Sequence, residues 1–136
     1  MPNEFSFHED DQFKWQRFIS AEDVRRFAEV VGDLNPIHLD ADVAASSFFK
    51  KRIVHGAFLG GLISKVLGMD FPGKGTVYIS QVSVFKRPVY VDTTVTVEVK
   101  VTQVIAEKRR LVLKTNILND RGELCMTGSA TIWLPE

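Results

Sequence analysis

The segment HGAFLGGLISKVLGMD, residues 55–70, is the most distinctive part of this 136-residue chain. It is apolar on nearly every side, and Lys65 is the only clearly charged residue inside it. A helix without a polar face is expected to be buried rather than to lie on the surface. We therefore predict one buried helix over residues 55–70.

Small residues give this helix an unusual surface. Gly60 and Gly61 each cost about 1 kcal/mol relative to alanine in a helix interior. A helix that keeps both is expected to need the close approach of another backbone or of a ligand. Gly56, Gly60 and Ser64 recur at a spacing of four and form a stripe along one side.

Downstream of the helix the hydrophobic period changes to two. Valines at 95, 97, 99 and 101 alternate with polar residues, which indicates a strand buried on one face. Further strands are expected over 75–85, 109–118 and 124–134, and the NDRG sequence at 119–122 is typical of a turn. Short connections make neighbouring strands antiparallel.

Upstream, residues 13–19 favour a short strand, and residues 20–33 favour a helix. Ser20 is a candidate N-cap, Asp23 completes a capping box, and Gly32 suits the left-handed position after the last turn. The apolar face of this helix is expected to contain Val24, Phe27, Ala28 and Val31, and a second short helix is expected over 41–49.

One buried helix and a run of antiparallel strands pack best when the sheet wraps around the helix. The pattern predicts an α+β hot-dog architecture. The length suits a single domain over residues 1–136.

Composition excludes several classes of function. Seventeen basic and seventeen acidic residues give a net charge of zero, which argues against a nucleic-acid partner. No apolar run reaches the length of a membrane span, and the N-terminus lacks the pattern of a signal peptide. The single cysteine, Cys125, fits a reducing cytoplasm and lies out of phase with the buried face of its strand. We expect a cytoplasmic protein without a membrane partner.

The segment GDLNPIHLD, residues 32–40, is the candidate for chemistry. Pro36 fixes its own φ and makes Asn35 extended, so residues 33–38 are expected to form a stiff loop rather than to continue the helix. Asp33 and His38 can converge on such a loop and share acid and base work. The alternative is structural: a cap from Asp33, an Asx-turn from Asn35 and a hydrogen-bonded loop histidine.

Residues 32–68 resemble the signature of the (R)-specific enoyl-CoA hydratases of the MaoC-like dehydratase family, and the similarity continues through 72–102. It is carried by the G-D-x-N-P-x-H core, the I-V-H-G sequence and the glycine-rich helix. The resemblance implies a hot-dog fold and reversible addition of water to trans-2-enoyl-CoA thioesters, giving (R)-3-hydroxyacyl products. It also implies a homodimer or a larger homo-oligomer.

The resemblance also implies roles for individual residues. Asp33 and His38 match the catalytic pair, Gly56 matches the backbone N–H that binds the thioester oxygen, and Ser64 matches a supporting residue. We place Asn35 and His55 with the substrate-binding candidates, although His55 also suits the simpler role of orienting the helix start. The histidines and acids show no metal-ligand spacing, so neither a metal nor a cofactor is expected.

Two further functions remain open. The chain could act on acyl carrier protein thioesters, as a 3-hydroxyacyl dehydratase of fatty-acid synthesis, or it could be a non-catalytic hot-dog subunit that binds acyl thioesters. The basic residues Lys50, Lys51, Arg52, Lys86 and Arg87 are either a solvated surface or contacts for the phosphates of CoA.

Overall fold

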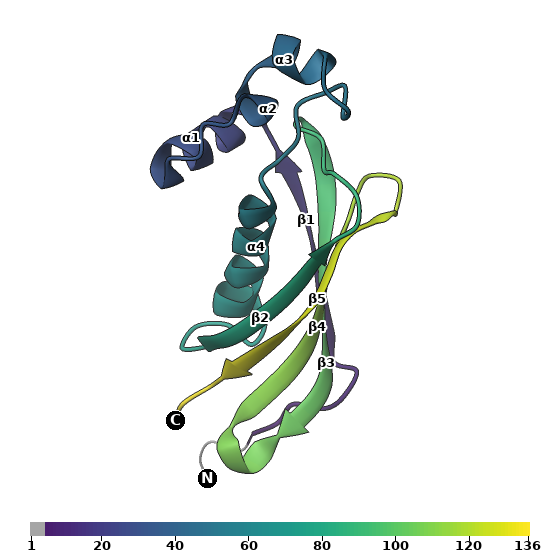
Figure 1. The fold of residues 1–136 in the computed structure, drawn as a ribbon. Coiled ribbons are helices and arrows are strands. Elements are labelled where there is room, and N and C mark those ends of the chain that lie inside the picture. Colours follow the sequence, from purple (N-terminus) through teal and green to yellow (C-terminus); the bar gives the residue numbers. More distant parts are fainter. Residues whose placement is uncertain (1–4) are drawn as a thin grey trace.

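A computed structural model describes residues 5–136, in which an antiparallel sheet curls around one helix (Figure 1). The elements are β1 Gln12–Ile19, α1 Ala21–Val31, α2 Pro36–Leu39, α3 Ala41–Ala45, α4 Gly56–Lys65, β2 Val77–Phe85, β3 Thr93–Ile105, β4 Arg110–Leu118 and β5 Leu124–Trp133. The strand order is β1-β3-β4-β5-β2, and every neighbouring pair is antiparallel. Both the predicted helix and the predicted strands are therefore present. None of the helices formed by residues 5–136 combines the length and the apolar character needed to span a membrane.

The core lies between the inner face of the sheet and α4. Alternate residues of β3 are fully buried, as the period of two predicted; they are Val95, Val97, Val99 and Val101. The buried residues of α4 are Phe58, Leu59, Leu62 and Ile63. Each fully buried side chain of this kind contributes about 1.5–3 kcal/mol, so this contact carries much of the stability of the fold.

The helix α4 is buried as predicted where it faces the sheet, but one of its sides is exposed. The sheet covers one side of the helix, while Ala57, Gly61 and Ser64 are exposed on the other. A Cβ atom added at Gly60 or Gly61 would meet no atom of another element within 4 Å among residues 5–136. The close neighbour that these glycines predicted is therefore not supplied by the described part of the chain.

Regular α-helix ends at Lys65, and a π-helical segment continues to Asp70. The charge of Lys65 is accommodated by two contacts. Its Nζ atom lies 3.6 Å from the ring centroid of Trp15 and 2.8 Å from Oδ2 of Asp70. A cation over an aromatic face, paired with a carboxylate, explains why a lysine is tolerated on this apolar helix.

The ends of α1 follow the predicted signals. Ser20 and Asp23 form the capping box, and Gly32 adopts the left-handed conformation with φ of 84°. Val24 and Ala28 are buried, but Val31 is 55% exposed and does not join the apolar face as predicted. Every residue from 29 to 36 is exposed, so the last turn of α1, which contains Val31, lies outside the packed part of the helix. The helix predicted over 41–49 is shorter and ends at Ala45.

Cys125 also differs from its prediction, because it is fully buried. Ile117 pairs with Met126, while Leu118 pairs with Leu124, so Cys125 is the extra residue of a β-bulge. The bulge changes the alternation and turns this side chain inward. Burial raises the pKa of the Cys125 thiol.

Candidate active site

The candidate site begins where α1 ends and the short helix α2 follows it. Asn35 is the N-cap of α2, and its Oδ1 accepts a hydrogen bond from the N–H of Ile37 at 3.2 Å. Pro36 occupies the first helical position, where its missing N–H costs nothing. His38 therefore lies on a short helix and not on the predicted loop. The Asn-Pro pair carried this signal, since both residues favour a helix start.

His38 is buried, and its Nδ1 atom lies 2.6 Å from the carbonyl oxygen of Ile53. A carbonyl oxygen only accepts hydrogen bonds, so Nδ1 must carry the proton. In the neutral ring the lone pair is then on Nε2. This arrangement leaves Nε2 able to accept a proton from a bound water.

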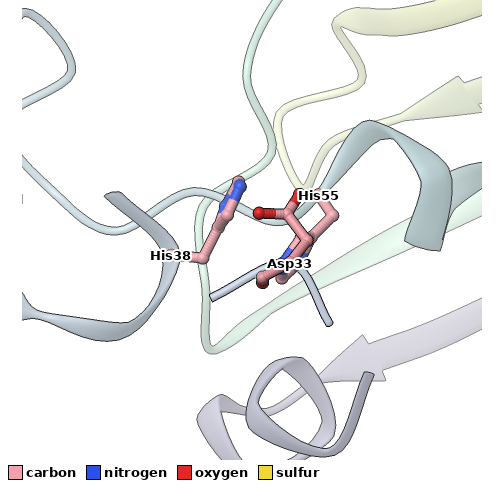
Figure 2. A group of neighbouring side chains, drawn as sticks. All are labelled: Asp33, His38 and His55. Carbon is pink, nitrogen blue, oxygen red and sulfur yellow. The ribbon is translucent and has the colours of Figure 1, made fainter. Parts of the chain in front are cut away.

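Asp33 lies close to the two buried histidines of this region. Its Oδ1 accepts a hydrogen bond from the N–H of Asn35 at 3.2 Å, and the residue is exposed. The ligand-type atoms of Asp33, His38 and His55 all lie within 4.8 Å of one another. Figure 2 shows the three side chains gathered where the α1–α2 connection meets the start of α4. The structure thus brings together the acid and the imidazole that the sequence motif paired.

His55 is the third member of this group and is 3% exposed. Its Nε2 donates to the carbonyl oxygen of Asp33 at 3.1 Å. Its ring stacks on that of His38, with centroids 3.7 Å apart and an interplanar angle of 23°. Sequence reasoning missed this stacking, because it depends on how two separate segments overlie each other.

The same three residues are close enough to suggest a metal site, but the stacking argues against one. An imidazole binds a metal in the plane of its ring, at about 2.1 Å. Two nearly parallel rings stacked face to face cannot both meet that condition for one ion. One nitrogen of each ring is also engaged with a carbonyl oxygen. The absence of a metal remains a prediction, which this geometry favours.

Gly56 begins α4 directly after His55. As the first helical residue it has no carbonyl four residues earlier in the helix, and the helix dipole favours negative charge at this point. It lines an apolar cavity of about 390 Å³ together with Phe49, Ile53, Leu59 and Phe85. Ile53 links the cavity to the acid–imidazole pair, since its carbonyl holds His38. A larger hollow of about 650 Å³, around Phe5 and the chain segment 106–109, contains none of the candidate residues.

Ser64 lies apart from Asp33 and His38, whereas Asn35 contacts Asp33 through its backbone N–H. Ser64 is eight residues after Gly56 on α4, roughly 12 Å along the helix axis, and it is exposed. The side-chain oxygen of Asn35 is engaged as a helix cap. The Asx-turn that we considered for Asn35 is therefore what the structure contains.

Comparison with known proteins agrees with this fold. The MaoC like domain model matches residues 6–121. An (R)-specific enoyl-CoA hydratase of Aeromonas caviae is 44% identical over 120 residues, covering 88% of this chain and 89% of that protein. A mitochondrial 3-hydroxyacyl-[acyl-carrier-protein] dehydratase of Arabidopsis thaliana is 32% identical over 92% of this chain and 76% of its own length.

A solved structure extends the similarity to three dimensions. It is that of an (R)-hydratase from A. caviae involved in PHA biosynthesis, and it has a TM-score of 0.93 and 39% identity. The alignment covers 96% of this chain and 98% of the other. The predicted hot-dog fold is therefore confirmed. The chain belongs to the MaoC-like domain family.

Proposed function

We propose that this protein is an (R)-specific hydratase that adds water reversibly to trans-2-enoyl-CoA thioesters, giving (R)-3-hydroxyacyl-CoA. One observation carries the proposal: Asp33 and His38 lie together beside the start of α4, and the hydrogen bond from Nδ1 of His38 to Ile53 leaves Nε2 of that ring free to act as a base. The hydratase named in Aeromonas caviae supports the substrate class.

This arrangement suits one bound water. Water is a weak nucleophile, so a base must remove a proton as its oxygen attacks C3 of the enoyl group. We assign that base to Nε2 of His38, because Nδ1 already donates to Ile53. The Asp33 carboxylate accepts a hydrogen bond from the second O–H of the same water and orients it; that hydrogen stays on the oxygen added to C3. The proton taken by His38 is returned to C2, so the elements of one water add to one face of the double bond.

Charge moves to the thioester oxygen while the new bond forms. The N–H of Gly56 is our candidate donor to that oxygen, because it stands at the N-terminus of α4 and lines the apolar cavity. A donor of this kind acts where charge develops, and it typically contributes about 10²–10³-fold to turnover. The cavity beside Gly56 is our candidate for the acyl group or the pantetheine arm.

Substitution of the pair tests the proposal. Asp33→Asn and His38→Ala are each expected to lower kcat for crotonyl-CoA hydration by about 10²–10⁴-fold. The double variant should lose far less than the product of the two losses, since both residues act on one water. His38→Ala should also lower the melting temperature, because the buried ring is hydrogen-bonded to Ile53 and stacked on His55, so kcat is compared per folded molecule. Retained hydration in Asp33→Asn would refute the assignment, as would an inactive wild-type protein.

The basic residues near the site bear on whether the thioester substrate is carried by CoA or by acyl carrier protein. Lys50, Lys51 and Arg52 line a small cavity with Asp92, whereas Lys86 and Arg87 line the apolar cavity beside Gly56. Phosphate groups are recognised by such cations. We propose that Lys50 and Lys51 contact the phosphates of CoA.

Crotonyl-pantetheine provides the matched substrate, because it lacks the nucleotide and its phosphates. The variant Lys50→Glu/Lys51→Glu should raise KM for crotonyl-CoA by about tenfold, or 1.4 kcal/mol, and leave crotonyl-pantetheine unaffected. Lys114→Glu, on β4 and distant in sequence from these residues, is the charge-reversal control. Faster turnover of crotonyl-acyl carrier protein than of crotonyl-CoA would instead favour the dehydratase of fatty-acid synthesis.

We further propose that the active form is a homodimer in the cytoplasm. The exposed side of α4 and the edge strand β2 are the candidate contact, and a second copy there would supply the neighbour missing beside Gly60 and Gly61. The single buried cysteine suits a reducing compartment. A non-catalytic subunit is the less suitable alternative, because it has no need of both Asp33 and His38.

A further inference from the structure

We propose that His55 is a positioning residue that holds both members of the catalytic pair, through two separate features of its imidazole. The inference rests on the hydratase function proposed above and deepens it. The ring face of His55 sets the plane of the His38 ring, and its Nε2–H group anchors the backbone of Asp33. His55 itself touches neither the water nor the substrate.

The first feature is the stacked ring. His38 is held at its edge by the carbonyl oxygen of Ile53 and at its face by His55, with the ring centroids 3.7 Å apart. A single hydrogen bond at Nδ1 leaves the ring free to tilt about that bond. The stacked neighbour removes this freedom, so the direction of Nε2 is fixed.

The second feature is the hydrogen bond from His55 Nε2 to the carbonyl oxygen of Asp33, at 3.1 Å. Asp33 follows the left-handed Gly32, and its side chain is exposed. Its carboxylate would move with any shift of its backbone. The bond from His55 ties that backbone to the start of α4.

The segment that supplies both features is itself anchored. The N–H of Val54 donates to the carbonyl oxygen of Val89 at 2.8 Å, between the Ile53 and His55 contacts. Phe27 of α1 packs against the His55 ring, with centroids 5.0 Å apart. Residues 53–55 thus form an anchored segment that contacts both His38 and Asp33.

The unused nitrogen of His55 shows that packing alone does not explain the residue. Nδ1 is buried and has no hydrogen-bond partner among residues 5–136. A buried polar atom without a partner is unfavourable, and a phenylalanine ring would fill this space without one. The feature that histidine supplies and phenylalanine lacks is the Nε2–H group, which donates to the carbonyl oxygen of Asp33.

Two substitutions separate the features. His55→Phe keeps a ring face and removes the N–H donor, whereas His55→Gln keeps a donor and removes the ring. Each should lower kcat for crotonyl-CoA hydration by about 10–100-fold while KM changes less than about threefold, because misplaced groups slow the chemical step. Val24→Ala, in the buried face of α1, is the control that lowers melting temperature without changing kcat per folded molecule.

Double variants test whether His55 acts through the pair. The loss in His55→Gln should disappear in the His38→Ala background, where no imidazole remains to be oriented. The loss in His55→Phe should disappear in the Asp33→Asn background, where the carboxylate is already gone. Losses that multiply in both backgrounds would show a merely structural role and overturn the proposal, and so would unchanged kcat in both single variants.

A spectroscopic readout keeps the test independent of activity. In the imidazole ¹H–¹⁵N spectrum of the wild-type protein, His38 should be protonated at Nδ1, and its ring protons should be shifted upfield by the stacked His55. That upfield shift should be lost in His55→Gln. If wild-type protein failed to hydrate crotonyl-CoA, the proposed function would fall, while the spectrum would still decide whether His55 orients His38. An unchanged spectrum in His55→Gln would overturn the positioning role.

Discussion

Two backbone carbonyl oxygens determine which nitrogen carries the proton in His38 and in His55. Ile53 engages Nδ1 of His38, and Asp33 engages Nε2 of His55. Because both oxygens only accept hydrogen bonds, the two rings carry their protons on different nitrogens. Nε2 of His38 is left free for chemistry, whereas Nδ1 of His55 is buried and has no hydrogen-bond partner among residues 5–136. One histidine is therefore suited to proton transfer and the other to positioning.

Gly56 offers a prediction about packing at the same scale. A Cβ atom there would lie 2.9 Å from Cζ of Phe85, which is closer than such atoms approach. The Phe85 side chain is 54% exposed and can turn aside, so we expect Gly56→Ala to lower the free energy of unfolding by about 1 kcal/mol, the low end of overpacking costs. In a Phe85→Leu background this cost should fall to about zero, which urea denaturation of the four proteins would measure. An equal cost in both backgrounds would place the strain elsewhere.

The relaxed double variant also isolates the catalytic contribution of Gly56. With Phe85 shortened, a methyl group at position 56 no longer displaces the ring, but it still crowds the proposed thioester site. We expect crotonyl-CoA turnover in Gly56→Ala/Phe85→Leu to stay at least about tenfold below that of Phe85→Leu alone. Full recovery of turnover would mean that the donor to the thioester oxygen lies at another residue.

The capping box of α1 gives a prediction at the scale of elements. The pKa of Asp23 is lowered, mainly by the backbone N–H of Ser20, with Arg17 adding to the effect. A lowered folded-state pKa stabilises the fold above the unfolded value, and that stability is lost as pH falls through the folded value. The contribution of Asp23 should therefore be complete above its ordinary pKa of 3.8 and disappear below it.

Asp23→Asn provides the measurement. The substitution should cost about 1 kcal/mol near neutral pH, which is typical for loss of a helix cap. The difference between wild type and variant should shrink as pH falls below 3.8. Thermal unfolding from pH 7 to pH 2 would follow it. A constant difference over that range would show that the charge of Asp23 does not contribute.

Local patterns predicted those elements whose signals are local. The alternating valines identified β3, and Ser20, Asp23 and Gly32 identified both ends of α1. The inward turn of Cys125 was beyond such patterns, because its bulge arises from the register between β4 and β5. The exposed side of α4 was equally hidden, since an apolar helix pattern does not reveal which layer covers it. The convergence of Asp33 with His38 was predictable from the rigid Asn-Pro turn, but the overlap with His55 required the tertiary fold.

At the scale of the whole molecule, β2 is an edge strand with an unusual surface. Edge strands of monomeric proteins commonly carry charges that prevent pairing with another sheet. β2 instead exposes apolar side chains, including Val77, Ile79, Val82 and Val84. The end of the strand also meets the start of α4, where Phe85 lies close to Gly56, and the outer side of that helix carries the small residues. Both features favour a second copy of the chain as the covering partner.

The homodimer prediction follows from this edge. Sedimentation at micromolar concentration should give twice the chain mass of 15.3 kDa. Val82 is 68% exposed on β2, so Val82→Lys would introduce a charge into the paired edge and should yield a folded monomer. Val30→Lys, at a valine that is 85% exposed on α1, is the matched control and should remain dimeric. A monomeric wild type would reject the prediction. A Val82→Lys protein that stayed dimeric would move the interface away from β2, because a two-fold contact at this strand would bury the introduced charge in both copies without a partner.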